Sequence, residues 1–208
     1  MLKKEYKKMY LIILLVIYQS LLYLISKLSP FAIHILGSSV DDKIPFIPAF
    51  IYFYVGWYLM LFIVPFLFLK DNEKVFYKYI ISTFICISAC CFVYFIYPTT
   101  IIRESTLSSG ITDFVVRFIY AIDTPVLNCF PSMHCIICFM FMFYTWGLKN
   151  TNKYLKITIQ VLSLLVVLST VFVKQHVVID IISALIIAVI VYFVSKYIKI
   201  PKWMLKKN

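Results

Sequence analysis

Six long apolar stretches, separated by short polar or charged segments, form the main pattern along this chain. They cover residues 9–25, 49–69, 75–97, 131–148, 154–173 and 177–198. A helix needs about 20 apolar residues to cross a bilayer, and each stretch reaches or approaches that length. No internal repeat divides the chain. The pattern predicts an all-α polytopic membrane protein, with residues 1–208 forming one domain of six transmembrane helices.

Composition agrees with a membrane location. Hydrophobic residues make up 63% of the 208 residues and charged residues only 14%, with a mean hydropathy of +0.95. A soluble domain of this length could not cover so much apolar surface. A net charge of +11 would suggest a nucleic-acid partner in a soluble chain. Here the lysines flank the apolar stretches, so we expect contact with membrane lipids and no nucleic acid.

Basic residues are distributed unevenly between alternate connections. The amino terminus, residues 70–78, residues 149–156 and residues 196–207 hold 15 of the 20 lysines and arginines. The other connections hold five: Lys27, Lys43, Arg103, Arg117 and Lys174. Because cytoplasmic segments carry the excess of positive charge, both termini are predicted to be cytoplasmic. The segment around Lys174 then faces the opposite side, and we expect the protein in the plasma membrane.

The connection over residues 98–130 contains a further helical pattern. Apolar residues recur at helical spacing at Ile111, Phe114, Val115, Phe118, Ile119 and Ile122, with Asp113 and Arg117 on the other side. This predicts a short amphipathic helix. It either lies along the outer membrane interface or packs as an ordinary surface helix on the bundle. Either position puts it beside the residues considered next.

His176 and Asp180 lie four residues apart between the last two apolar stretches. If this segment is helical, both side chains share one face. Asp180 could then hold one ring nitrogen of His176 and leave the other for a reactant. An ionisable group at membrane depth costs about 2.5–3.5 kcal/mol on insertion scales, which favours a functional pair. The alternative is a polar pair that only packs against a neighbouring helix.

A second polar segment opens the fourth apolar stretch, where Pro131, Ser132 and His134 follow one another closely. Proline suits a first helical turn, and the free amides there form an anion site. The alternating topology brings His134 to the same membrane face as His176. The third histidine, His34, lacks such a motif and serves as an internal control.

Other polar residues give weaker signals. Cys135 and Cys138 lie beside His134 in the sequence, and positions 134 and 138 would share a helical face. No further ligand set accompanies them, so we expect no metal and no other cofactor. The six cysteines lie mostly in apolar stretches and do not suggest a disulfide framework. Three outer carboxylates, Glu104, Asp113 and Asp123, are interpreted as solvated or interfacial.

Two of these segments resemble known motifs. Pro131-Ser-Met-His134 and Ser169-x6-His176-x3-Asp180 are similar to the second and third motifs of the type 2 phosphatidic acid phosphatase superfamily. Arg103 matches the arginine of its first motif, whereas the lysine expected near position 96 is absent. With Lys174-Gln175 before the histidine, the chain is more similar to the branch of inositol phosphorylceramide synthase and its bacterial relatives. The motifs span residues 97–180.

The resemblance implies three catalytic residues. His176 would attack phosphorus and form a phosphohistidine, and Asp180 would orient its ring. His134 would protonate the leaving lipid alkoxide and then activate the acceptor, which is acid–base catalysis. The implied substrate is a lipid phosphate or diphosphate.

The resemblance also implies a phosphate-binding set. Arg103, Ser132 and Ser169 would hold phosphate oxygens. The superfamily has an arginine after this serine, where the present chain has Thr170, so one positive charge is missing from the set. Lys174 is the nearest residue that could supply it. The alternative is that Lys174 is an interfacial anchor that reaches toward lipid phosphates.

Three functions remain open. The first is a phosphatase that transfers the phosphoryl group to water, and the second is a phosphotransferase that moves a phosphate-containing head group to a lipid or polyol alcohol. Both begin with the same phosphohistidine, so the motifs do not separate them. The third is a noncatalytic carrier or assembly subunit. A carrier would distribute polar residues toward the membrane midplane, whereas here they gather at one face.

The charge distribution makes a testable prediction about topology. Reporter fusions at Asn150 and Asn208 are expected to report the cytoplasm, and a fusion at Ser109 the opposite side. A cytoplasmic signal at Ser109, or an opposite-side signal at Asn150, would contradict both the span count and the predicted side of the site.

Overall fold

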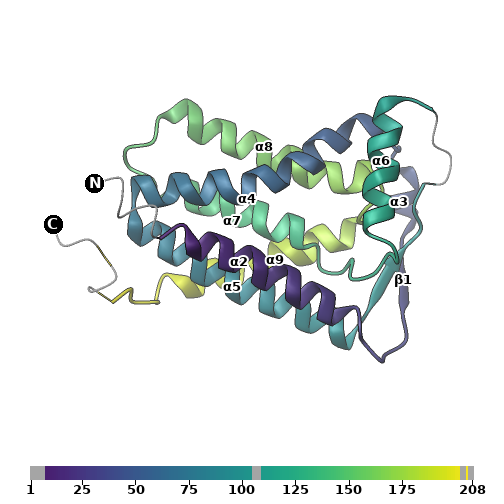
Figure 1. Cartoon of the computed structure of the whole chain (residues 1–208), viewed down its shortest axis with the longest axis horizontal. Helices are drawn as coiled ribbons and strands as arrows, with labels where there is room; N and C mark the ends of the chain where they lie inside the picture. Colours follow the sequence, from purple (N-terminus) through teal and green to yellow (C-terminus); the bar gives the residue numbers. More distant parts are fainter. Residues whose placement is uncertain (1–7, 105–108, 202–204, 206–208) are drawn as a thin grey trace.

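The computed structural model describes residues 8–104, 109–201 and 205. Within these residues, six long helices run along the long axis of the molecule (Figure 1). They are α2 (Tyr10–Ser26), α4 (Ile51–Asp71), α5 (Glu73–Ile96), α7 (Met133–Thr145), α8 (Lys153–Phe172) and α9 (Val178–Ser195). The six helices coincide with the six apolar stretches. The start of α2 and the end of α9 lie at the same end of the bundle (Figure 1).

Four of the described helices are long and apolar enough to cross a membrane, which indicates an integral membrane protein. These are the helices over Pro48–Asp71, Glu73–Ile96, Lys153–Phe172 and Val178–Ser195. The 17-residue α2 and the 13-residue α7 are shorter. The predicted count of six spans therefore stays a prediction. Because α7 packs against α5, α8 and α9, it forms the centre of the bundle.

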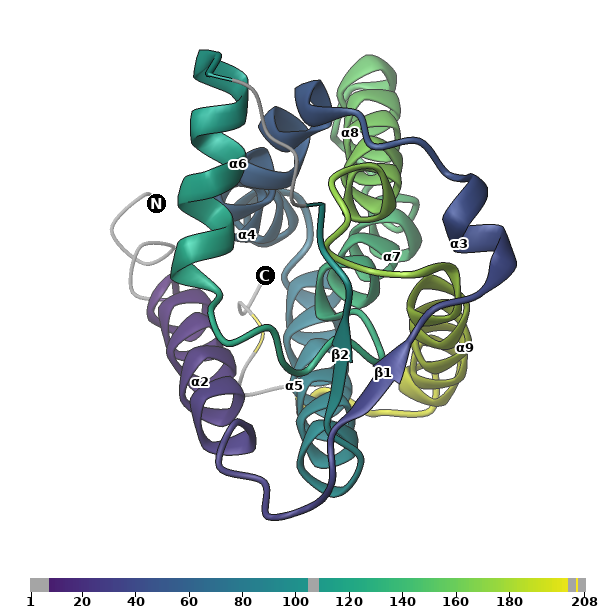
Figure 2. The same ribbon diagram turned by 90° about the vertical axis from the view of Figure 1, so that its right-hand side faces the viewer.

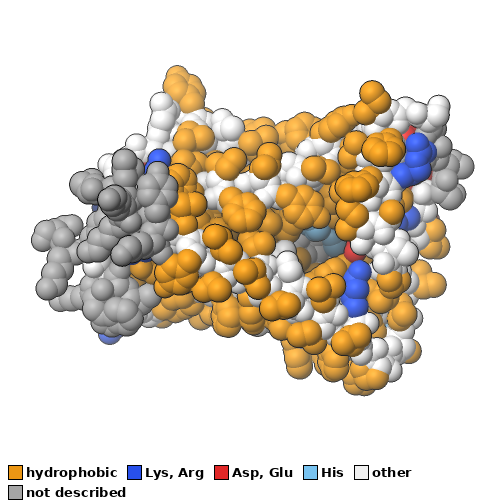
Figure 3. Space-filling view, viewed as in Figure 1, with side chains coloured by type: hydrophobic (Ala, Val, Ile, Leu, Met, Phe, Trp, Pro, Cys, Tyr) orange, Lys and Arg blue, Asp and Glu red, His pale blue; other side chains and the backbone are white. Residues whose placement is uncertain are grey.

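The sides of the bundle are apolar. Large hydrophobic side chains such as Leu14, Leu59 and Ile190 are more than half exposed. Hydrophobic side chains also cover most of the face of the molecule seen in Figure 3. Exposed apolar surface on this scale is unfavourable in water and marks contact with another apolar phase. The side surface therefore fits a lipid environment.

The connections at the opposite end from the α2 start cover that end of the bundle, here called the loop end (Figure 2). They contain α3 (Ser39–Lys43), the 3-10 turn Pro48–Phe50 and α6 (Ile111–Ile122). They also contain two strands, β1 (His34–Leu36) and β2 (Thr99–Ile101), which pair in parallel with His34 opposite Thr99. The chain is mostly helical, as predicted, and these two three-residue strands are its only strands among the described residues.

The amphipathic helix is confirmed as α6, over the predicted residues. Its buried edge, Val116 and Ile119, packs in one cluster with Ile51 and Tyr54 of α4. Its other apolar edge, which includes Phe118, is exposed. The helix thus packs on the bundle by one edge and leaves an apolar edge free. Its position at the membrane interface stays a prediction.

Candidate active site

His176 and Asp180 form a hydrogen-bonded pair at the start of α9. The Nδ1 atom of His176 lies 3.0 Å from Asp180 Oδ2, and the same oxygen accepts the Val177 backbone N–H at 3.0 Å. The Asp180 side chain is fully buried and that of His176 is 8% exposed. The contact was expected, but its geometry differs. His176 precedes the helix, and Asp180 reaches back from its first turn to both groups.

The backbone of the turn before α9 also fixes His176. The N–H groups of Gln175 and His176 both donate to the carbonyl of Thr170, each at 2.9 Å. Lys174 adopts a φ of 50°, in the left-handed region that non-glycine residues rarely occupy. This turn lets the chain reverse directly after α8. The ring of His176 is therefore held through both its side chain and its backbone.

His134 faces this pair from the first turn of α7. The centroids of the His134 and His176 rings are 5.8 Å apart. The rings of Tyr54 and Trp57 of α4 flank the His134 ring, with centroid distances of 4.6 and 4.2 Å. Its Nε2 atom is buried and has no hydrogen-bond partner among the described residues. The structure thus brings the two predicted histidines together. The third histidine, His34, lies in β1 and stacks on the ring of Tyr97.

The start of α7 is anchored to two other helices. The Pro131 carbonyl accepts the Tyr94 hydroxyl of α5 at 2.6 Å. The Ser132 N–H donates to the Asp180 carbonyl of α9 at 3.2 Å, and Ser132 Oγ accepts the Cys135 N–H as the helix cap. Two amides of this helix start are thus already bonded. These bonds set the position of His134 relative to Asp180.

Arg103 lies beside the histidines in a polar network. One of its terminal nitrogens donates to the Asp123 carboxylate and to the Gln175 side-chain oxygen. Its other terminal nitrogen donates to the Tyr120 carbonyl at 3.2 Å, and the guanidinium covers the Tyr120 ring. Lys27 contributes a second cation 3.4 Å from Asp123. Arg103 is therefore held at the cavity that His176 also lines, by partners from α6 and its end and from the turn before α9.

Tyr120 adds a further link in this network. Burial raises the pKa of Tyr120 to about 12, although Arg103 acts in the opposite direction. The hydroxyl therefore stays protonated at neutral pH, and it donates to the Val173 carbonyl at 2.7 Å. This bond joins α6 to the turn that carries His176.

Sequence reasoning missed two members of this network. Asp123 was interpreted as a solvated or interfacial carboxylate, but it is partly buried and pairs with Arg103. Gln175 was not considered as a site residue, although it is only 3% exposed and contacts Arg103. The available signal for Gln175 was its position directly before the motif histidine. Asp123 had no comparable signal in the sequence.

The predicted phosphate-binding hydroxyls lie near the pair but are fully buried. Ser169 donates to the Val166 carbonyl at 2.6 Å, and Thr170 donates to the Val167 carbonyl at 2.7 Å. Each of these two hydroxyls thus bonds within α8. Ser132 caps α7, as described above. Phosphate binding by these three residues stays a prediction.

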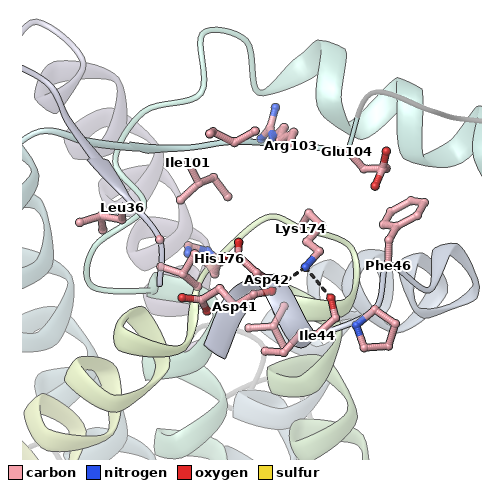
Figure 4. A pocket seen from close by; sticks show the side chains of 15 residues that line it. Leu36, Asp41, Asp42, Ile44, Phe46, Ile101, Arg103, Glu104, Lys174 and His176 are labelled. Atoms are coloured by element: carbon pink, nitrogen blue, oxygen red, sulfur yellow. Dashed lines mark hydrogen bonds between the residues drawn. The ribbon is translucent and has the colours of Figure 1, made fainter. Parts of the chain in front are cut away.

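Lys174 connects the α3 segment to the turn that carries His176 through two hydrogen bonds. Its Nζ donates to the carbonyls of Asp41 and Ile44, at 3.0 and 2.6 Å (Figure 4). On the other side of His176, the Asp41 side chain accepts the Val178 N–H at 2.7 Å. The α3 segment therefore holds this part of the chain by hydrogen bonds both before and after His176. Two of the three Lys174 donors are occupied by these bonds.

Two cavities meet at His176. The lateral cavity, of about 340 Å³, opens between α2, α4 and α6 and is lined by His134, His176, Gln175 and many aromatic and aliphatic side chains. A recess with histidine atoms is visible on the side of the molecule (Figure 3). The end cavity, of about 520 Å³, lies under the loops. It is lined by His176, Arg103, Lys174, Asp41, Asp42 and Glu104, among others (Figure 4).

Potential metal ligands are scattered. In the ranges that the structure describes, no group of three or more histidine, cysteine, aspartate or glutamate side chains is placed to hold a metal ion. All six cysteines are described, and each is a buried free thiol.

At one end of the bundle, a carboxylate-held histidine faces a second histidine, and an arginine lines the same cavity as the first. Such a set of side chains is suited to group transfer. The family model for the PAP2 superfamily matches residues 10–203, so the chain belongs to this superfamily. No curated protein and no solved structure matches the chain. Members of the superfamily are phosphatases or phosphotransferases, so the chain is an enzyme of this class. The match does not distinguish the inositol phosphorylceramide synthase branch.

The hydrogen bond from Val178 to Asp41 predicts that a change at Asp41 lowers the free energy of unfolding. Asp41→Ala removes the side chain that caps the start of α9, and such caps contribute about 1 kcal/mol. We expect the free energy of unfolding in detergent to fall by about that amount. Asp41→Asn keeps an acceptor oxygen and should lose less than half of it. Asp42→Ala is the matched control, since it removes the same charge from the exposed neighbouring residue. Equal stability of Asp41→Ala and Asp42→Ala would contradict the capping role.

Proposed function

We propose that this protein is a membrane-embedded lipid phosphatase that removes phosphate from a lipid phosphate or diphosphate through a phosphohistidine on His176. The observation that carries the proposal is the His176–Asp180 bond facing His134 across 5.8 Å. Membership of the PAP2 superfamily supports the reaction class. The aromatic and aliphatic wall of the lateral cavity supports a lipid substrate.

In the first step His176 acts as the nucleophile. Asp180 accepts a hydrogen bond from the Nδ1–H group of His176, so the lone pair of the ring is on Nε2. This pair forms the nitrogen–phosphorus bond while the bond from phosphorus to the lipid oxygen breaks. The electron pair of the broken bond goes to the lipid oxygen, which takes a proton from the His134 ring. The alcohol then leaves, and Asp180 stabilises the positive charge that forms on His176.

In the second step the roles of His134 reverse. Its ring, now neutral, takes a proton from a water molecule as that oxygen bonds to phosphorus. The nitrogen–phosphorus bond breaks and its electron pair returns to His176, which releases phosphate. Packing of the His134 ring against the rings of Tyr54 and Trp57 keeps it in one position for both transfers. No metal is needed for either proton transfer.

Arg103 is the principal cation for the phosphoryl group. It lines the end cavity together with His176, and its Asp123 and Gln175 partners hold it in place before substrate arrives. A preorganised donor of this kind lowers the barrier by about 2.7–4 kcal/mol. Ser132, Ser169 and Thr170 support this region through their helix bonds and remain candidates for phosphate contacts.

The cellular arrangement follows from the charge distribution. With both termini in the cytoplasm, the loop end lies on the extracytoplasmic side of the plasma membrane. The substrate would enter this end from the outer leaflet, with its chain in the lateral cavity. The polar end cavity would then admit water from outside.

The mechanism makes a direct prediction for the three histidines. His176→Ala and His134→Ala are expected to lower kcat for a lipid phosphate by at least about a hundredfold, because one removes the nucleophile and the other the acid–base group. His34→Ala, at a ring that stacks on Tyr97, should stay within about threefold. Released phosphate is measured with purified protein in detergent micelles. Full activity of His176→Ala would refute the proposal.

A phosphotransferase of the inositol phosphorylceramide synthase type is the second candidate. The observation in its favour is that two cavities of different character meet at His176, so donor and acceptor could reach it by separate routes. The carboxylates of Asp41, Asp42 and Glu104 in the end cavity suit the hydroxyl groups of a polyol acceptor.

An acceptor assay separates the two candidates. The phosphatase proposal predicts that release of inorganic phosphate from a lipid phosphate is the main reaction, whether or not a polyol or lipid alcohol is added. Mass spectrometry of the lipids follows both products. If a phosphate-containing group appears on the alcohol in more than half of the turnovers, the protein is the transferase instead.

A further inference from the structure

We propose that the Gln175 side-chain amide donates a hydrogen bond to an oxygen of the phosphoryl group, in place of the arginine that the chain lacks at Thr170. This role rests on the proposed function, because it requires a phosphoryl group at His176. Gln175 lies within the third motif, directly before His176, but the motif assigns no role to it. Its place in the site comes from three observations on its partners, its burial and its cavity.

The orientation of the Gln175 amide is determined by Arg103. A guanidinium has only donors, so the group that faces it must be the amide oxygen. Arg103 donates to Gln175 Oε1, and Asp123 holds the same Arg103 nitrogen. The amide nitrogen of Gln175 must therefore point away from Arg103. If the amide were flipped, its N–H groups would face the N–H groups of Arg103, and no hydrogen bond could form.

The amide nitrogen that results is buried and unused. Gln175 is 3% exposed, and its Nε2 has no hydrogen-bond partner among the described residues. A buried donor without an acceptor is unfavourable, and an acceptor from a bound ligand would satisfy it. The His134 Nε2 atom has the same status. Gln175 lines the lateral cavity together with both histidines, so an oxygen bound between the rings would be an acceptor for it.

Gln175 is also rigidly placed relative to the nucleophile. The backbone N–H groups of Gln175 and His176 share the Thr170 carbonyl as acceptor. A donor one residue before the nucleophile therefore keeps its position during the reaction, as electrostatic stabilisation of a transition state requires.

The two positions suggested by the sequence are less suited to this role. The Thr170 hydroxyl donates to the Val167 carbonyl within α8. The Lys174 ammonium donates to the carbonyls of Asp41 and Ile44, away from the histidines. The Thr170 hydroxyl would have to give up its bond to Val167, and Lys174 has only one donor left beside its two carbonyl bonds. The Gln175 amide nitrogen gives up no bond that the structure describes.

Two substitutions separate a donor from a residue that only positions Arg103. Gln175→Glu keeps the shape and the acceptor for Arg103, but it replaces the N–H donors by an oxygen and a negative charge, both unfavourable toward phosphoryl oxygens. Gln175→Met keeps the length and loses both functions. If Gln175 donates to the phosphoryl group, both variants should lower kcat for a lipid phosphate by at least about a hundredfold. Gln160→Glu is the matched control in α8, where the amide donates to the Met142 carbonyl, and it should stay within about threefold.

The outcome has a distinct pattern for each role. An active Gln175→Glu with an inactive Gln175→Met would mean that the residue only orients Arg103, and would overturn the proposal. So would two variants within threefold of the parent. Rates are compared per folded protein, judged by unfolding in detergent, and Gln175→Glu carries the test if Gln175→Met does not fold.

A second measurement separates this proposal from the proposed function. Orthovanadate resembles the phosphoryl group and needs no turnover, so its dissociation constant is measured for parent and variants by thermal shift. The proposal predicts binding weakened at least tenfold in both Gln175 variants and unchanged in Gln160→Glu. A parent that binds orthovanadate but hydrolyses no lipid phosphate would refute the proposed function alone. Unchanged binding in both Gln175 variants would refute the role of Gln175.

Discussion

Asp180 carries a carboxylate into an apolar helical bundle, where an ionised group is tolerated only with hydrogen-bond donors around it. One of its oxygens accepts both the His176 ring and the Val177 amide. Its backbone carbonyl accepts the amide of Ser132. The residue therefore joins the start of α9, the turn before it and the start of α7. His134 lies two residues beyond Ser132. The hydrogen bonds of Asp180 therefore also fix the position of the His134 ring relative to the His176 ring.

Segments at the loop end of the bundle also hold the turn that carries His176. The α3 segment holds the turn on both sides of His176 through Lys174 and Asp41, and α6 holds it through Tyr120 and Val173. Arg103 is fixed between α6 and the turn by Asp123 and Gln175. The site is thus assembled from segments far apart in the chain. Preorganisation of this kind is how a site stabilises developing charge without moving.

Much of this arrangement could be predicted from the sequence because it depends on local pattern. The length of the apolar stretches located the six long helices, and the spacing of Val115, Phe118 and Ile122 located α6. The alternation of six helices brought His134 and His176 to one end. The paired strands β1 and β2 could not be predicted, since three residues each are too few to show a strand period.

The remaining differences come from long-range contacts. Arg103 meets Gln175 across 72 residues of sequence, and Lys174 meets Asp41 across 133. No spacing rule connects such positions. The His176–Asp180 contact was predicted from helical spacing, yet α9 starts only at Val178 and Asp180 turns back to the amide of Val177. A residue pattern can show that two groups meet, but the bond that joins them depends on where the helix begins.

The central claim is that phosphorus is bonded to His176 during turnover, and it can be tested by trapping. A lipid diphosphate labelled in its terminal phosphate is mixed with His134→Ala protein and quenched within milliseconds under alkaline conditions, which preserve phosphohistidine. A diphosphate leaving group needs less protonation, so the bond to His176 can form while its hydrolysis is slow. We predict an acid-labile phosphate that peptide mass spectrometry locates on His176. Label on another residue, or turnover of the parent with no labelled protein at any time, would contradict the account.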